Sequence, residues 1–140
     1  MNITVRVYAF LVNEKGEVLL LNEQYNGIHF TKLPGGGLEK EEGILECIHR
    51  ELNEELNLTN LDLKQIYTTE DFILSKFHEN TQVLAVYYEG HVDQHEIKLN
   101  TTDHKLKSLN WVDMNTLSKD HFTFQTDKKA FKIFTSVNKI

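Results

Sequence analysis

The alternation of hydrophobic and polar positions over the first 21 residues predicts two strands of one sheet. Residues 3–11 are rich in β-branched and aromatic side chains, and a turn-like segment over residues 13–16 follows them. Residues 17–21 come at hairpin distance and are apolar at positions 18–21. Such a run is typical of a strand that is covered on both faces, so we expect helices on both sides of the sheet.

Helical spacing is strongest over residues 42–56, where apolar residues recur at positions 44, 48, 52 and 56. Long strands are predicted over residues 61–74 and 82–92, another strand over 105–113, and a closing helix over 127–137. The loop at 33–37 contains the only proline and three of the seven glycines, so its backbone can approach a ligand closely. This mixed order of strands and helices predicts a layered α/β or α+β domain.

Composition restricts the class of protein. A chain of 140 residues, 40% of them hydrophobic, predicts a single domain over residues 1–140. It contains no apolar stretch of the roughly 20 residues that a membrane span needs and no signal-like start, so we expect a cytoplasmic protein without a membrane partner. The net charge of −6 argues against nucleic acid as a partner. The single cysteine, Cys47, cannot form an internal disulfide and is expected to be core filler rather than a nucleophile.

Glutamates are concentrated in the predicted helix. Seven of the 21 acidic residues lie between positions 39 and 55. On a helical wheel with Ile44 at zero, Glu55 lies at about 20° and Glu51 at about −20°, on the buried side, while Glu54 lies near the margin at about −80°. Like charges at this spacing, placed near the negative end of a helix and partly buried, are unfavourable. We therefore expect a bound divalent cation to compensate all three carboxylates.

Two neighbouring features support such a site. The glycines at 35–37 precede the helix and offer bare backbone groups to the same place. The wheel separates Arg50 from Glu42 by about 80°, which allows a bridge around the helix start. An ordinary surface ion pair of little energetic value is the alternative interpretation.

The spacing of these residues resembles the signature of the Nudix hydrolases, G-x5-E-x7-R-E-U-x-E-E-x-G-U with U aliphatic. The matching positions run from Gly36 through Glu42 to the segment over residues 50–58, and they cover 23 of the 140 residues. One position differs, because Asn57 stands where the family has its second glycine. Asparagine is the side chain that best replaces glycine in a left-handed helix cap, so this difference affects stability more than catalysis.

The resemblance implies a Nudix-like α/β/α sandwich with a mixed β-sheet between helices. It also implies that Mg²⁺, or alternatively Mn²⁺, is held by Glu51, Glu54, Glu55 and the carbonyl of Gly35. Arg50 and Glu42 would orient the catalytic glutamate, and Glu51 would help to deprotonate the attacking water, so the catalytic set is Glu42, Arg50, Glu51, Glu54 and Glu55. The implied reaction is metal-assisted cleavage of a phosphoanhydride in a nucleoside diphosphate linked to another group.

Several alternatives stay open at this point. A nucleoside triphosphate is the favoured small-molecule substrate, with a nucleotide sugar or ADP-ribose as the other substrate classes. A non-catalytic nucleotide-binding module is the alternative from another class of protein. The sequence does not decide between a monomer and a homodimer.

Residues outside the signature are weaker candidates. Family members often recruit a further carboxylate, for which Asp93, Glu96 and Asp103 are candidates that cannot be ranked. A zinc site at His91, His95 and His104 is disfavoured, because such scattered sets are usually surface residues. Core packing, rather than stacking on a base, is the expectation for five aromatic residues: Tyr67, Phe72, Phe77, Phe122 and Phe124.

Overall fold

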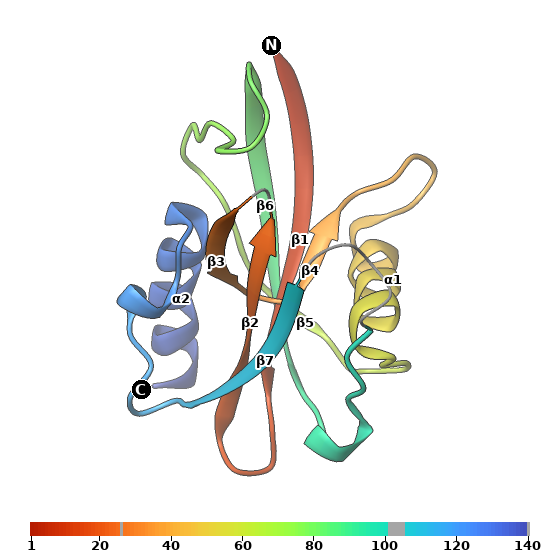
Figure 1. Cartoon of the computed structure of the whole chain (residues 1–140), viewed down its shortest axis with the longest axis vertical. Coiled ribbons are helices and arrows are strands. Elements are labelled where there is room, and N and C mark those ends of the chain that lie inside the picture. The colour runs from red at the N-terminus through yellow and green to blue at the C-terminus, as the bar shows by residue number, and fades with distance from the viewer. Residues whose placement is uncertain (26, 101–105, 140) are drawn as a thin grey trace.

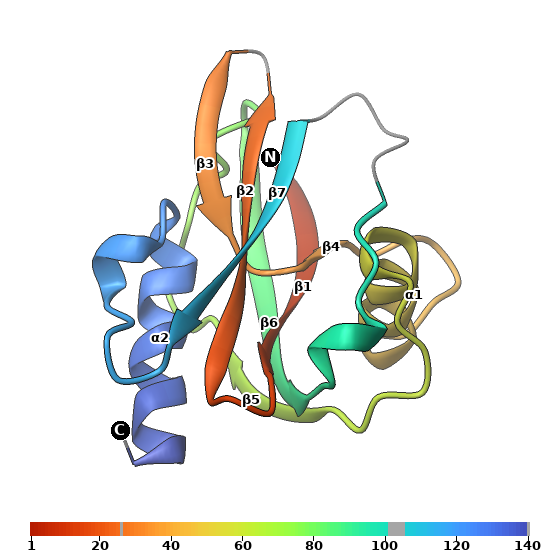
Figure 2. The ribbon, with the colours of Figure 1, turned by 60° about the horizontal axis from the view of Figure 1, so that its bottom comes forward.

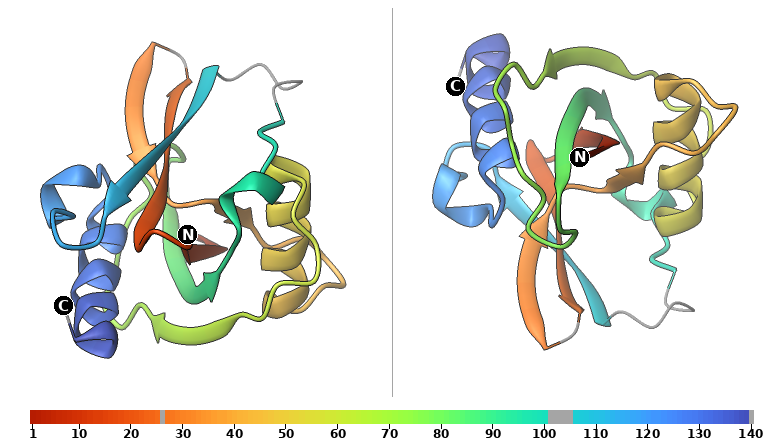
Figure 3. Two further views of the ribbon diagram at one scale, coloured as in Figure 1. Left: turned by 90° about the horizontal axis from the view of Figure 1, so that it is seen from below. Right: turned by 90° about the horizontal axis from the view of Figure 1, so that it is seen from above.

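A mixed sheet lies between two helices in the computed structural model, which describes residues 1–25, 27–100 and 106–139 (Figure 1). Views from below and above place α1 and α2 on opposite faces of the sheet, which confirms the predicted α/β/α sandwich (Figure 3). No helix in this described part is long and apolar enough to cross a bilayer. The elements are β1 (Asn2–Val12), β2 (Glu17–Tyr25), β3 (Ile28–Lys32), β4 (Gly35–Gly37), α1 (Ile44–Leu56), β5 (Lys64–Thr68), β6 (Thr81–His91), β7 (Leu106–Asp113), α2 (Gln125–Asn138) and the short 3-10 helices η1 (Gln94–Glu96) and η2 (Lys119–His121).

β1 is the central strand of the sheet. It pairs in parallel with β6 along its whole length, and antiparallel with β2 and β4 on its other edge. β2 in turn pairs antiparallel with both β3 and β7. Figure 2 shows β2 between β3 and β7 at the top of the view. The short β4 runs beside the middle of β1, with Gly35 opposite Tyr8 and Gly37 opposite Arg6.

Successive residues of the central strands serve two separate cores. Val7, Ala9 and Leu11 of β1 belong to the buried cluster that contains the apolar side of α1. Phe10 and Val12 belong instead to the cluster that contains Ala130 and Phe134 of α2. The same division holds for β2, whose run at positions 18–21 supplies alternate residues to the two clusters. The expectation that this run is covered on both faces is confirmed.

Helix α1 has the ends that its sequence favours. Gly43 is its N-cap, and the side chain of Glu46 accepts a hydrogen bond from the Gly43 N–H at 2.9 Å. Asn57 ends the helix in the left-handed region, with φ 57° and ψ 31°. Its side-chain amide also donates to the Lys98 carbonyl at 2.7 Å, which ties the helix end to the segment after β6. The cap position expected for Asn57 is confirmed.

The predicted strand over residues 61–74 is wrong in its length. Only β5 forms there, and the side-chain oxygen of Thr69, just beyond it, accepts from the Ala85 amide at 3.0 Å. The chain then leaves the sheet through Glu70 and Asp71, and only one isolated bridge, from Leu74 to Gln82, restores pairing. Two of the apolar residues that suggested a longer strand are exposed, Phe72 at 63% and Leu74 at 54%.

The segment between β2 and α1 contains two short strands that the sequence pattern did not predict. β2 itself continues to Tyr25, four residues beyond its expected end, and pairs with β3. The glycines at 35–37 form β4 rather than an irregular loop. Because Gly35 has a φ of 142°, it takes a backbone conformation that favours glycine and lets the chain turn directly against β1.

A buried hydrogen bond fastens α2 to the sheet. Asp127, in the first turn of α2, is only 1% exposed and accepts from the Tyr87 hydroxyl of β6 at 2.6 Å. Burial raises the pKa of Asp127 to about 6, although the Tyr87 hydrogen bond lowers it. Nearby, the rings of Phe10 and Phe134 stack with centroids 4.4 Å apart.

The cap at Asn57 predicts opposite outcomes for two substitutions. Asn57→Ala replaces a side chain that tolerates the left-handed region by one that does not, and it removes the bond to Lys98, so we expect the free energy of unfolding to fall by about 2 kcal/mol. Asn57→Gly loses the same bond but relieves the backbone, so its free energy should stay within about 1 kcal/mol of the parent. Urea unfolding of the three proteins measures both values, and equal losses in the two variants would contradict the cap.

The buried Asp127 predicts a pH-dependent stability difference. Its folded-state pKa lies above the model-peptide value of 3.8, so the native state binds the extra proton between about pH 4 and 6, and the stability contributed by Asp127 falls as pH rises through that window. Asp127→Asn removes this loss while keeping an acceptor for Tyr87. Relative to the parent, the variant should gain about 3 kcal/mol between pH 4 and 7. Denaturant unfolding across that range tests this, and a difference that does not change with pH would disprove it.

Candidate active site

Arg50 is held in one position by the first part of the signature. Its Nε and Nη2 donate to the Glu42 carboxylate at 2.9 and 2.7 Å, and Nη2 also donates to the Gly37 carbonyl at 2.9 Å. The bridge that the helical wheel allowed is therefore formed, and both side chains are largely shielded from solvent. Hydrogen bonding from Arg50 lowers the pKa of Glu42 to about 2, so Glu42 is ionised at neutral pH.

The free end of the Arg50 fork points along α1 toward the next carboxylates. Nη1 donates to Glu51 at 3.0 Å and to the more exposed Glu54 at 3.2 Å. A longer ion pair of 3.5 Å reaches Glu39 at the surface. Arg50 is thus anchored by Glu42 and Gly37 at one end of its guanidinium and contacts Glu51 and Glu54 with the other.

Glu51 lies directly against β4, the strand of three glycines that we call the glycine strand. A β-carbon at Gly36 would come within 2.5 Å of the Glu51 carboxyl carbon, so the carboxylate occupies space that only glycine leaves free. Burial, and then the charge of Glu55, raise the pKa of Glu51, while Arg50 lowers it. A carboxylate with a raised pKa is a stronger proton acceptor than an ordinary glutamate.

Glu55 is buried one turn further along the helix, with 8% exposure. One carboxylate oxygen accepts from the Gly35 amide at 2.9 Å. The other lies 3.7 Å from the Lys32 ammonium and 3.6 Å from the Lys107 ammonium. The carboxylate is therefore held between a backbone donor and two cations from different strands.

Lys32 is the central cation of this arrangement. Its buried ammonium donates to the Gly35 carbonyl at 3.0 Å and lies 3.6 Å from the carboxylate of Glu23, which is also buried. Burial lowers the pKa of Lys32, but the carboxylates of Glu55 and Glu23 outweigh burial and leave it raised. The ammonium also lies 5.6 Å from the centre of the Tyr8 ring.

Arg6 adds a third cation beside the two lysines. Its Nε donates to the Tyr8 hydroxyl at 2.9 Å. Burial lowers the pKa of Arg6, while Tyr8, Glu51 and Glu55 raise it, so the net shift is upward and the charge is kept. The side chains of β1, β3 and β7 therefore bring positive charge to the same place where α1 brings negative charge.

These contacts correct one expectation from the sequence. The burial of Glu51 and Glu55 suggested carboxylates compensated only by a bound cation, whereas the chain supplies Arg50, Lys32 and Lys107 for that purpose. A helical wheel shows only the neighbours within one helix, whereas the compensating lysines come from strands that are distant in sequence.

Glu54 is placed differently from the other two predicted ligands. Its side chain is 57% exposed and pairs with Arg50. Among the described residues, the signature carboxylates do not form a set of three ligand atoms within 4.8 Å of one another. The structure therefore brings Glu51, Glu55 and Gly35 together and leaves Glu54 at the solvent side, in agreement with its marginal place on the wheel.

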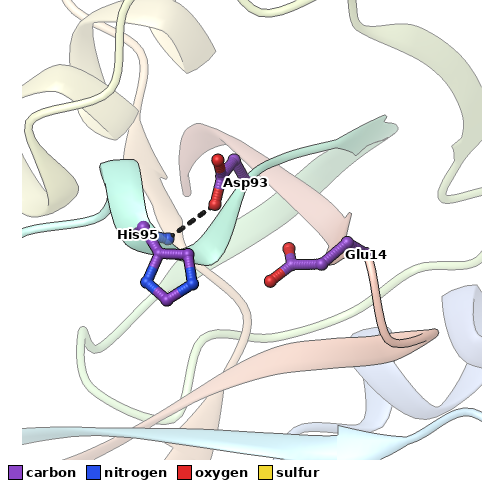
Figure 4. Close-up of side chains that lie close together, drawn as sticks. All are labelled: Glu14, Asp93 and His95. Carbon is purple, nitrogen blue, oxygen red and sulfur yellow. Dashed lines mark hydrogen bonds between the residues drawn. The ribbon is translucent and has the colours of Figure 1, made fainter.

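The one set within the described chain that does meet this distance is elsewhere. Glu14, Asp93 and His95 lie together beyond the ends of β1 and β6 (Figure 4). All three are exposed, and the carboxylates of Glu14 and Asp93 already accept backbone amides of η1. Of the candidate extra carboxylates, Asp93 is in this set, Glu96 is exposed in η1, and Asp103 lies outside the described residues.

The other candidate residues, Cys47, two histidines and several aromatic residues, lie outside this carboxylate cluster or outside the described residues. Burial raises the pKa of Cys47 to about 12, so it is not a nucleophile, as expected. His104 lies outside the described residues, and His91 is exposed at the end of β6. Phe122 is buried and Tyr67 packs against the same core.

Core packing is the wrong expectation for Phe72, which is exposed in the connection after β5. Phe77 is 43% exposed, and its ring contacts Phe30 and Phe124 with centroids 5.4 and 5.7 Å away. The Phe77 ring therefore covers the buried Phe30 and the half-buried Phe124 from the solvent side rather than lying in the interior itself.

Sequence reasoning missed four charged residues of the site: Arg6, Glu23, Lys32 and Lys107. A signal existed for Glu23, because it continues the period of two set by Leu19 and Leu21 on the face toward α1. No comparable signal marks Lys32 or Lys107, whose positions depend on the pairing of β2 with β3 and β7.

The donor set fits a hard divalent cation. The Gly35 carbonyl and the carboxylates of Glu51 and Glu55 are oxygen ligands of the kind that Mg²⁺ and Mn²⁺ prefer. The missing β-carbon at Gly36 leaves room for the Glu51 carboxylate beside that carbonyl.

Comparisons with known proteins identify the family and the fold. A family profile described as NUDIX domain matches residues 2–133. No curated protein sequence matches the chain. Among solved structures, a MutT protein from Methanosarcina mazei is similar with a TM-score of 0.75 and 25% identity, covering 99% of this chain and 97% of that one.

Two further solved structures share the fold at lower identity. A MutT NUDIX hydrolase from Burkholderia pseudomallei has a TM-score of 0.76 and 19% identity, covering 95% of this chain and 98% of its own. The E. coli dihydroneopterin triphosphate pyrophosphohydrolase has a TM-score of 0.73 and 17% identity, covering 91% and 92%. With the family profile spanning nearly the whole chain and the signature residues gathered at one place, the chain belongs to the Nudix hydrolase family.

Proposed function

We propose that this protein is a Mg²⁺-dependent pyrophosphohydrolase of nucleoside triphosphates. The observation that carries the proposal is the convergence of Glu51 and Glu55 on the glycine strand, with Arg50 locked against Glu42 behind them. Such an arrangement fixes carboxylates that are poorly compatible with an ordinary interior against the glycine backbone of β4.

Glu51, Glu55 and the carbonyl of Gly35 would hold the metal ion, with Glu54 completing the set from the solvent side. The ion supplies charge neutralisation of the phosphates and activation of water. Mn²⁺ has the same preference for oxygen ligands and is expected to substitute.

The residues of the chain have separable tasks in this proposal. Glu51 accepts the proton of the attacking water, a role favoured by the burial that raises its pKa. Arg50 is a positioning residue, because it holds Glu51 at 3.0 Å while Glu42 and Gly37 hold Arg50 itself. Loss of the Glu42 contact would let the guanidinium, and with it Glu51, turn away from Gly36.

The substrate class is supported by charge. Arg6, Lys32 and Lys107 bring three cations to the carboxylate site of a protein whose net charge is −6. Because these cations already offset the carboxylates beside them, a bound divalent ion leaves a net positive charge that attracts a polyphosphate chain rather than an uncharged ligand. The similarity to a dihydroneopterin triphosphate pyrophosphohydrolase adds support for a triphosphate.

A substrate panel tests the proposal. With Mg²⁺ present, we expect pyrophosphate release from at least one nucleoside triphosphate, at a higher kcat/KM than the turnover of any nucleotide sugar or ADP-ribose. Preferred cleavage of a diphosphate-linked nucleotide would replace the triphosphate assignment. Binding of nucleotides without release of phosphate or pyrophosphate from any member would instead indicate a non-catalytic module.

Replacement of Glu55 separates chemistry from folding. Glu55→Gln keeps an acceptor for the Gly35 amide but removes the charge, so we expect kcat to fall by about 100-fold or more while circular dichroism stays unchanged. Glu46→Gln, on the exposed side of the same helix, is the matched control and should retain full turnover. Full turnover in Glu55→Gln would exclude this residue from the metal site.

A further inference from the structure

An internal cation already lies on the proposed metal ligands. The ammonium of Lys32 donates to the Gly35 carbonyl at 3.0 Å and lies 3.7 Å from the Glu55 carboxylate. These two groups are the backbone ligand and one of the acidic ligands of the metal site. Lys32 itself is 7% exposed, so the side chain has no open route to solvent from this position.

A divalent ion bound to these two oxygens would lie within a few ångströms of the Lys32 ammonium. Two like charges a few ångströms apart in a partly buried site repel by several kcal/mol. The Gly35 carbonyl would also have to exchange a hydrogen bond for a metal bond. Entry of the ion therefore requires the ammonium to move.

Glu23 offers the displaced ammonium a place inside the protein. Its buried carboxylate, on β2, lies 3.6 Å from the Lys32 ammonium. A small rotation of the lysine stem toward Glu23 would release Gly35 and Glu55 without exposing the charge. This gives a reason for a buried glutamate at a position where β2 otherwise carries leucines.

We propose that Lys32 is an internal counter-cation that occupies the Gly35 and Glu55 ligands until a divalent ion displaces it toward Glu23. The inference rests on the proposed metal-dependent function and adds a competition within the same site. Lys32 lowers the affinity for the ion and keeps the ligands in position before the ion arrives. Its effect is a coupling between two cations, so it is measurable without turnover.

Lys107 makes a matched comparison possible. Its ammonium lies 3.6 Å from the same carboxylate of Glu55, whereas it is Lys32 that donates to the Gly35 carbonyl. Removal of either lysine deletes one positive charge next to Glu55. Only removal of Lys32 also frees the backbone ligand, so the two variants separate occupation of the site from general electrostatics.

Binding of Mn²⁺, followed by electron paramagnetic resonance of the free ion without nucleotide, is the decisive measurement. We expect Lys32→Met to tighten the Mn²⁺ dissociation constant about tenfold. Lys107→Met should tighten it clearly less, and Lys132→Met, on the exposed side of α2, should stay within twofold of the parent. Equal affinities for Lys32→Met and the parent, or equal gains in Lys32→Met and Lys107→Met, would overturn the inference while leaving the metal site intact. Failure of every protein to bind Mn²⁺ would overturn both the inference and the proposed function.

A measurement on the unsubstituted protein covers the case in which Lys32→Met fails to fold. In a Mg²⁺ titration followed by NMR, the Cε–Hε signal of Lys32 should shift together with the Gly35 amide, at the same ion concentration, while the signal of Lys132 stays in place. A Gly35 amide that responds to Mg²⁺ while the Lys32 signal does not move would show that the ammonium is not displaced.

Discussion

The structure depends on burying the carboxylate of Glu55 next to positive groups that the chain itself provides. A buried carboxylate without partners costs several kcal/mol or is protonated, and neither outcome suits a metal ligand. Here the Gly35 amide, Lys32 and Lys107 surround it. The helix can therefore turn its acidic residues inward next to compensating charges, and the remaining features of the site follow from this arrangement.

The sheet topology makes these contacts possible. The parallel pairing of β1 with β6 places Arg6 and Tyr8 in the middle of the molecule, and the antiparallel β4 lies directly beside them. Because Gly36 lacks a β-carbon, Glu51 can lie against this strand, and Arg50 can reach the Gly37 carbonyl from the same helix. The hairpin of β2 with β3 and the pairing of β2 with β7 then add Lys32 and Lys107 from the other side. Six elements, β1, β2, β3, β4, β7 and α1, thus contribute residues to one small volume.

The residues that α1 contributes to this site could be predicted from the sequence, whereas the lysines that β3 and β7 contribute could not. Spacing within α1 is local, so the inward direction of Glu51 and Glu55, the bridge from Arg50 to Glu42 and the cap at Asn57 could all be argued from helical geometry. Lys32 and Lys107 meet Glu55 only through strand pairing, whose register a single sequence does not reveal. The overlong strand after residue 61 has a related cause, because exposed apolar residues such as Phe72 follow the same pattern as buried ones.

Charge balance gives a physical order to the events at this site. Glu23, Glu51 and Glu55 face Arg6, Lys32 and Lys107, so the cluster is close to neutral before any ion binds. A neutral cluster can fold and stay buried without metal, which a group of unpaired glutamates could not. Arrival of a divalent ion then makes the same place positive, and a triphosphate, which the acidic protein as a whole repels, gains a local site of opposite charge. Because the attraction depends on the added ion, the neutral resting state makes substrate binding conditional on metal binding.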